Sequence, residues 1–205
     1  MVEGVGINDA DYPTQRFELV QPLERYPNGK LKLKCVWVCP FYRKWRGILT
    51  RCYSKKFLSV NPAYLGCSVE DEWLLFSNFK NWMMCQDWDG LHLDKDLLVF
   101  GNKVYGKDTC IFIPKNINSF ISEKRSISKS LVGASWNKDK GKYVAQCQNP
   151  FSGKYEHLGY FESELEAHKA WLSRKIEHAN ALAASQLNNR IATALINYYE
   201  NYPKP

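Results

Sequence analysis

Residues 131–179 read LVGASWNKDKGKYVAQCQNPFSGKYEHLGYFESELEAHKAWLSRKIEHA. Three short segments in this stretch are rich in aromatic and β-branched residues, and two stretches rich in Asn, Lys, Pro and Gly separate them. Turn formers between such segments are typical of antiparallel hairpins. The pattern predicts three strands, at 131–136, 142–148 and 155–161.

A helix is expected directly after the third predicted strand. Ser163 begins the sequence Ser-Glu-Leu-Glu, which has the spacing of a helix capping box. Apolar residues then recur at helical spacing. These residues are Leu165, Leu172, Ile176, Ala179 and Ala183. One face of the sheet is expected to pack on this stripe, so the other face should point outward.

The stretch resembles the DNA-binding domain of the APETALA/ethylene-response-factor family, which also occurs in phage and bacterial integrases and homing nucleases. The resemblance is carried by Gly133-Ala134, by GKYVA at 141–145, by LGYF at 158–161 and by EAHKA at 166–170. It implies a three-stranded antiparallel sheet packed on one helix. It also implies that the outward face of the sheet reads the major groove of double-stranded DNA.

The resemblance assigns roles to ten polar residues of this sheet. The positions that match base-reading residues are Ser135, Asn137, Gln146, Gln148, Tyr155 and His157. Gln can pair bidentately with adenine, while Ser and Asn can bond base edges or phosphate. The lysines expected at phosphates are Lys138, Lys140, Lys142 and Lys154. The alternative is an ordinary solvated sheet face, since outward strand residues are commonly polar.

Charge supports a polyanionic partner. The chain of 205 residues contains 28 Lys and Arg against 21 Asp and Glu, a net charge of +7, and 45% of it is hydrophobic. Such a composition is typical of a globular protein. The segment 25–56 contains ten basic residues and no acid, interleaved with aromatic side chains. This pattern suits a surface that tracks phosphates, although a solvated basic face would show it too. The basic residues expected to bind DNA there are Arg43, Lys44, Arg46 and Arg51.

Periodicity gives a coarse outline for the rest of the chain. Residues 1–34 are expected to be irregular with a strand or hairpin, and helices are expected at 41–53 and 71–85. A polar linker is expected within 119–130. A final helix should carry Leu187, Ile191, Leu195, Tyr198 and Tyr202 and stop before Pro203.

Cysteine spacing argues against a structural zinc site. Three residues rather than two separate Cys35 from Cys39, and the other five cysteines are scattered. The seven cysteines are therefore expected to be reduced thiols. No segment is apolar enough to span a bilayer, and the first residues lack the pattern of a signal peptide. We therefore expect an intracellular protein without a membrane partner.

Residues 91–118 suggest catalytic chemistry. They predict a strand, a Gly101-Asn102 turn, a second strand and the start of a helix. This plan resembles the ββα element of the HNH, or His-Me finger, nucleases, which use a divalent metal such as Mg²⁺ or Mn²⁺. The resemblance places Asp94 and Asn118 at the metal ligands and Lys95 at the general base. His92 is a candidate displaced base, because it shares a strand face with Asp94. The alternative is a ββα element that serves only as a DNA clamp.

Further motifs extend the resemblance to nearly the whole chain. YRKW at 42–45, LTRCY at 49–53, Glu72-Trp73 and LDKD at 93–96 resemble bacteriophage proteins described as HNH or homing endonucleases with an APETALA-type domain. The resemblance implies an α+β protein in the cytoplasm of an infected bacterial host. Its expected parts are a helical and ββα HNH-like module at 1–120, a linker at 121–130, and the sheet, its helix and a C-terminal helix at 131–205.

Three functions remain open at this point. The first is a metal-dependent DNA endonuclease, and the second is a non-catalytic DNA-binding protein with a regulatory or architectural role. A phage factor that acts on a host protein is the third. A lysine carries its proton at neutral pH and accepts none from water, so Lys95 at the base position favours DNA binding over cleavage. The sequence leaves the oligomeric state open.

Overall fold

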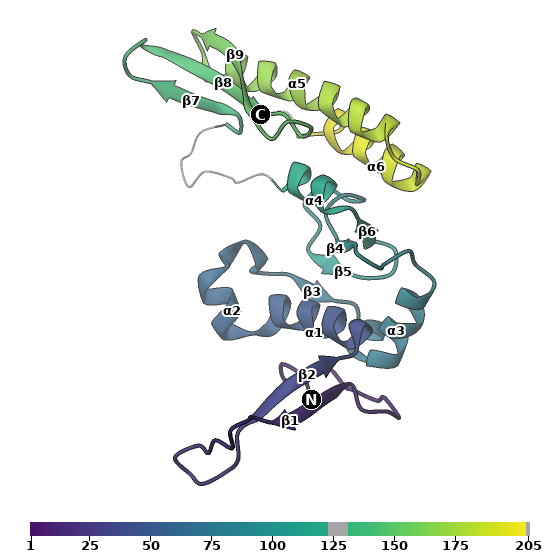
Figure 1. Cartoon of the computed structure of the whole chain (residues 1–205). Coiled ribbons are helices and arrows are strands. Elements are labelled where there is room, and N and C mark those ends of the chain that lie inside the picture. The colour runs from purple at the N-terminus through teal and green to yellow at the C-terminus, as the bar shows by residue number, and fades with distance from the viewer. Residues whose placement is uncertain (123–130, 204–205) are drawn as a thin grey trace. The chain divides into compact units, whose positions relative to one another are not determined.

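The computed structural model describes residues 1–122 and 131–203 of the chain. It is an α+β structure with several small sheets, shown in Figure 1. The chain forms two compact units. Unit 1 comprises Met1–Asp89 and Asn102–Cys110, and unit 2 comprises Gly90–Gly101 and Ile111–Pro205. Of the linker expected at 121–130, residues 123–130 lie outside the described part.

Unit 1 combines a hairpin with a helical core. Strands β1 and β2 pair antiparallel, and β3 pairs parallel with β5. The elements are β1 (Gln15–Leu19), β2 (Leu33–Val38), α1 (Pro40–Tyr53), α2 (Lys55–Val60), η1 (Pro62–Tyr64), β3 (Ser68–Val69), η2 (Asp71–Leu74), α3 (Phe76–Met84) and β5 (Val104–Tyr105). The helix expected at 41–53 is confirmed as α1.

Aromatic packing holds the helices of unit 1 together. Trp45 of α1 and Trp73 of η2 are fully buried, and the Trp45 indole N–H donates to the Trp73 carbonyl at 2.7 Å. Phe79 of α3 packs edge-on against Trp73. The prediction of a single helix at 71–85 was wrong in one respect. Leu75 has extended backbone angles (φ −91°, ψ 123°), so a 3₁₀ turn and the separate helix α3 replace it.

Unit 2 contains the remaining elements. They are β4 (His92–Asp94), β6 (Ile111–Ile113), α4 (Lys115–Ile121), β7 (Ala134–Asn137), β8 (Lys142–Gln148), β9 (Tyr155–Phe161), α5 (Glu164–Ala184) and α6 (Asn189–Glu200). Strands β8 and β9 match the expected ranges, and β7 begins three residues later than expected. Leu187 lies outside the last helix and is fully exposed, contrary to its predicted place on that helix.

One hydrophobic core joins Leu97, strand β6 and helix α4 to helices α5 and α6. Ile113 of β6, Ile117 of α4 and Leu195 of α6 are completely buried in it, as is Leu182 of α5 apart from 1% of its surface. The strand that follows the Gly101-Asn102 turn is β5, which pairs with β3, whereas β4 pairs antiparallel with β6. The segment 91–118 therefore supplies two strands and a helix to unit 2, but with a longer connection than expected.

The sheet β7-β8-β9 packs one face on α5 (Figure 1). Ala145 and Cys147 of β8 are buried on this face. The expected capping box is present, because the Ser163 side chain accepts from the Glu166 N–H and the Glu166 carboxylate accepts from the Ser163 N–H, each at 3.2 Å. The predicted apolar stripe of α5 was partly wrong. Leu165 is 41% exposed.

Two different faces of α5 are in fact buried. Trp171 lies against the sheet, where an added Cβ on Gly133 would come within 2.0 Å of its ring. Leu172 and Ile176, one and five positions further on, pack instead on the core shared with α6. None of the helices in the described ranges is long and apolar enough to cross a membrane.

Candidate nucleic-acid interface

The strand register places most of the predicted base-reading residues on one face. Gln146 pairs with His157 and Gln148 pairs with Tyr155 across β8 and β9. Directly opposed residues of antiparallel strands project to the same side. These four side chains are exposed, whereas Cys147, between Gln146 and Gln148, is buried against α5. The face away from α5 is therefore a solvent-facing surface of amide, imidazole and phenol groups.

Intramolecular hydrogen bonds distinguish the members of this surface. Asn137 Oδ1 accepts from the Lys140 N–H at 3.0 Å, and Gln148 Nε2 donates to the Gly153 carbonyl at 3.0 Å. Both side chains thus stabilise the turns that flank β8. The side chains of Gln146 and His157 have no hydrogen-bond partner in the described ranges. They are the pair most available to an external ligand.

A bulge adds a residue that sequence reasoning missed. Ala145 pairs with Gly159 but Gln146 pairs with His157, so Leu158 is an extra residue on β9. Such a bulge reverses the alternation beyond it. Tyr160 therefore lies outward, opposite Val144. Its ring centroid is 4.8 Å from that of His157. Strict alternation from His157 would place Tyr160 inward. Periodicity in the sequence therefore could not predict its outward orientation.

The predicted phosphate-binding lysines lie at the ends of this face. Lys138 and Lys140 lie in the exposed turn between β7 and β8, and Lys154 lies in the turn before β9. Lys140 Nζ is 5.9 Å from the Tyr160 ring centroid. Lys142 differs from the others, because its Nζ is 2.6 Å from a Glu162 carboxylate oxygen. Lys138, Lys140 and Lys154 are therefore the better phosphate ligands.

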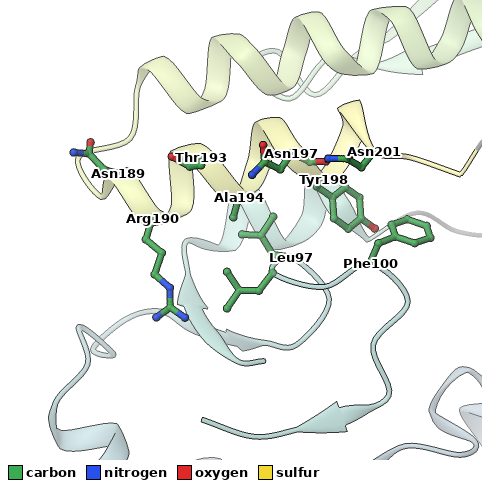
Figure 2. Close-up of a pocket in the computed structure, with 10 residues that line it drawn as sticks. Leu97, Phe100, Asn189, Arg190, Thr193, Ala194, Asn197, Tyr198 and Asn201 are labelled. Carbon is green, nitrogen blue, oxygen red and sulfur yellow. The ribbon is translucent and has the colours of Figure 1, made fainter. Parts of the chain in front are cut away.

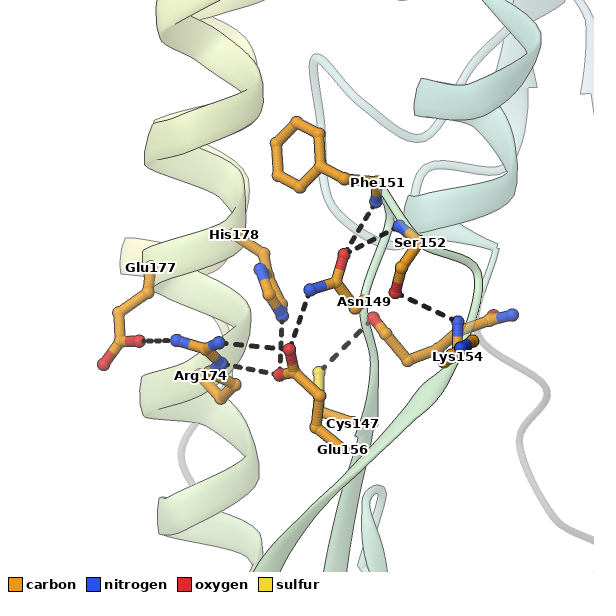
Figure 3. A network of polar contacts seen from close by, with 10 residues as sticks. Cys147, Asn149, Phe151, Ser152, Lys154, Glu156, Arg174, Glu177 and His178 are labelled. Atoms are coloured by element: carbon orange, nitrogen blue, oxygen red, sulfur yellow. Dashed lines mark hydrogen bonds and ion pairs between the residues drawn. The ribbon is translucent and has the colours of Figure 1, made fainter.

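A polar network beneath the sheet fixes the β8–β9 turn (Figure 3). Glu156 accepts hydrogen bonds from Arg174 Nε at 2.7 Å and from Asn149 Nδ2 at 2.7 Å, and His178 Nε2 lies 3.1 Å from it. Asn149 Oδ1 in turn accepts the backbone N–H groups of Phe151 and Ser152. The Arg174 and Asn149 hydrogen bonds lower the pKa of Glu156 to about 2. The turn that carries Lys154 is thus anchored to α5 by an ionised carboxylate.

The ββα segment brings two of its predicted site residues together. The Asn118 amide on α4 lies 3.2 Å from Nδ1 of His92 on β4. Asp94 is buried on the same strand, and its Oδ1 accepts the backbone N–H groups of Asp96 at 2.9 Å and of Leu97 at 2.7 Å. Burial raises the pKa of the Asp94 carboxyl above its ordinary value, and these two hydrogen bonds oppose that shift. In this arrangement Asp94 caps a turn.

Lys95 is also engaged. Its Nζ is buried and donates to Asp96 Oδ1 at 2.6 Å. An ammonium group that donates to a carboxylate does not accept a proton from water. Asn102, in the turn between the two predicted strands, lies in unit 1 and stabilises its own turn through Val104.

These contacts do not fit the metal centre that the resemblance implies. Mg²⁺ prefers oxygen ligands in near-octahedral geometry, commonly one or two carboxylates with water and phosphate. Here Oδ1 of Asp94 accepts from two backbone N–H groups, and Asp96 is paired with Lys95. Within residues 1–122 and 131–203, no group of three His, Cys, Asp or Glu side chains could hold a metal ion. No step of chemistry through a metal follows from this arrangement.

The basic residues predicted at 43–51 lie on α1 in unit 1. Arg43 and Arg46 are exposed, while Lys44 and Arg51 are half-buried. Burial, with a smaller contribution from Arg51, lowers the pKa of Lys44. Arg43 and Arg46 are thus open to a polyanion, and Lys44 and Arg51 are partly committed to packing.

The described residues of unit 2 line two concave regions, among others. A groove of about 630 Å³ lies between α6 and the segment 97–100, with Arg190, Asn197 and Tyr198 on its helical side (Figure 2). A second of about 620 Å³ lies at the edge of β8 and is lined by Gln146, Gln148 and the buried Lys175, among others. Lys175 Nζ donates to the Phe120 carbonyl at 3.0 Å. The second region adjoins the outward face of the sheet.

Comparisons with protein-family models, with curated proteins and with solved structures found no match.

Proposed function

We propose that the protein binds double-stranded DNA with the outward face of the β7-β8-β9 sheet. The observation that carries the proposal is the exposed cross-strand pair of Gln146 and His157. Both side chains lack an internal hydrogen-bond partner among the described residues, and both can exchange hydrogen bonds with base edges. Tyr155 and Tyr160 flank the pair and offer further contact area.

The distribution of charge supports a duplex rather than a small ligand. Lys138 and Lys140 at one turn and Lys154 at the other place cations at both ends of the polar face. Phosphate contacts of this kind position a protein on DNA, while contacts to base edges select the sequence. A sheet with amide groups between two cationic ends suits the major groove, whose edges distinguish all four base pairs. The resemblance in sequence supports a bacteriophage protein acting on DNA in the host cytoplasm.

We further propose that the ββα segment stabilises unit 2 and is not a cleavage site. Asp94, Asn118 and Lys95 all have structural partners, and the helix α4 contributes Ile117 and Phe120 to the core. Incubation of supercoiled plasmid with the protein and Mg²⁺ or Mn²⁺ tests this assignment. Metal-dependent cuts that Asp94→Asn abolishes would restore the endonuclease hypothesis.

The binding proposal is tested by selection followed by affinity measurement. Duplexes selected from a random-sequence pool are labelled, and binding is measured by fluorescence anisotropy for the wild type, Gln146→Ala and Asn180→Ala. Asn180 is an exposed amide on α5 and serves as the matched control. We expect Gln146→Ala to weaken binding by about 1–3 kcal/mol, roughly 5- to 150-fold, and to relax the preference at one base pair. Equal affinities for all three proteins would contradict the proposal.

Salt dependence tests the lysine assignments separately. Each phosphate contact contributes about 0.9 to the slope of log K against log salt concentration. The double variant Lys138→Gln, Lys140→Gln should therefore reduce the slope by about 2 for every duplex sequence. Lys169→Gln, an exposed position on α5, should leave the slope unchanged. An unchanged slope in the double variant would remove this turn from the interface.

A further inference from the structure

The hairpin of strands β1 and β2 in unit 1 is a two-stranded ribbon with exposed side chains on both faces. Nine of the eleven residues in β1 and β2 are exposed, and only Gln15 and Val38 at its base are half-buried. The connection between the strands is ordered by the Arg25–Leu31 bridge and by an ion pair of 2.7 Å between Lys32 and Glu24. A two-stranded ribbon exposed on both faces has no hydrophobic core of its own. A contiguous exposed apolar surface on such a ribbon commonly marks a binding site.

One face of this ribbon is apolar. Phe17 pairs with Cys35 and Leu19 pairs with Leu33, so these four side chains share a face. Phe17 is 52% exposed and Leu33 is 53% exposed. Leu23, in the connection, is 61% exposed. Exposed apolar side chains therefore occur both in the strands and in the connection between them.

Basic residues outnumber acids along this ribbon, and Lys34 lies on its opposite face, across from Glu18. The segment 15–38 contains five basic residues, Arg16, Arg25, Lys30, Lys32 and Lys34, against the two acids Glu18 and Glu24. Glu24 is neutralised by Lys32, whereas Lys30 and Lys34 form no ion pair with any described residue. The acid-free basic segment continues into α1 of the same unit, where Arg43 and Arg46 are exposed. A basic segment of this length matches an extended polyanion better than a short acidic peptide.

We propose that the β1–β2 ribbon is a second DNA-binding element, which places its apolar face in the minor groove and bends the duplex. Proteins that bend DNA from the minor groove insert Phe, Leu or Pro side chains between base steps while cations hold the flanking phosphates. Phe17, Leu33 and Leu23 provide the apolar groups, and Lys30 and Lys34 provide the charges. This proposal concerns a surface separate from the sheet and does not depend on it.

The test uses the full chain and a duplex labelled at its two ends with a fluorescent donor and acceptor. Bending brings the ends together and raises energy transfer at saturating protein. We compare the wild type with the double variant Phe17→Thr, Leu33→Thr, because Thr keeps strand propensity without the apolar bulk. The matched control is Val60→Thr, Leu65→Thr, which changes two exposed apolar residues elsewhere in unit 1. Near-ultraviolet circular dichroism checks that every variant is folded.

We expect the wild type and the control to raise energy transfer and the ribbon variant to lose most of that rise. Lys30→Gln with Lys34→Gln should reduce the salt slope by about 2. Gln146→Ala should bind more weakly yet bend DNA fully at saturation, which separates a failure of the ribbon from a failure of the sheet. A ribbon variant that bends DNA like the wild type would overturn the proposal.

Membrane binding is the competing outcome, because an apolar face with basic neighbours also suits anionic lipids. Co-sedimentation with vesicles of phosphatidylserine and phosphatidylcholine is run in parallel. Loss of vesicle binding in the Phe17→Thr, Leu33→Thr variant, with its DNA bending unchanged, would assign the ribbon to a lipid surface instead.

Discussion

Replacement of Asp94 separates a turn-capping role from a metal-binding role. In Asp94→Ala the buried N–H of Leu97 and the half-buried N–H of Asp96 lose their acceptor. A buried donor without a partner costs about 1–3 kcal/mol, so the two together should lower the unfolding free energy by about 2–4 kcal/mol. Asp94→Asn keeps an amide oxygen in the same place and should stay within about 1 kcal/mol of the wild type.

Urea unfolding followed by tryptophan fluorescence measures both variants. Because the pKa of Asp94 is raised by burial, its folded state binds the proton more tightly than the unfolded chain. Stability of the wild type relative to Asp94→Asn should therefore rise as the pH falls through that raised pKa. A turn-capping role for Asp94 would be excluded if Asp94→Asn lost as much stability as Asp94→Ala, or if Asp94→Ala unfolded like the wild type.

Two further predictions concern the fold around the sheet. Gly133 has φ +80° and lies against Trp171, so Gly133→Ala should lower stability by about 2–5 kcal/mol in urea unfolding. Gly153→Ala, at φ +71° with open space around it, should cost only about 1 kcal/mol, and equal losses would contradict the predicted clash. The low pKa of Glu156 contributes stability that is present above pH 4.5 and lost as the pH falls toward about 2. Glu156→Gln should therefore flatten the acid limb of the stability profile, and an unchanged limb would exclude this network as its source.

The sheet was predicted well from the sequence, because the residues that set its strand ends and the start of its helix are close together in the chain. The turn formers at 137–141 and 149–153 and the capping box at Ser163 act within a few residues of themselves, and β8 and β9 appear at the predicted positions. The outward orientation of Tyr160 was not predictable in the same way. It depends on a bulge at Leu158, which only the register between two strands reveals.

The role of the ββα segment depended on non-local contacts. The spacing of its apolar residues predicts a strand and a helix but not which elements pack on them. Helices α5 and α6 pack on them here. Spacing alone could pair Asp94 with Asn118, yet the hydrogen bonds of Asp94 go to the backbone of Asp96 and Leu97. A carboxylate that caps a turn and one that binds a metal look alike in sequence, because both require an Asp after a strand.

Photo-crosslinking to 5-iodouracil tests whether the outward face of the β7-β8-β9 sheet enters the major groove of DNA. The iodine replaces the thymine methyl group, which lies in the major groove, so adducts form with side chains that enter that groove. On a selected duplex we expect adducts on Tyr155, His157 or Tyr160, located by mass spectrometry of the digested complex. Adducts confined to the outer face of α5 or to unit 1, with none on β8 or β9, would contradict it.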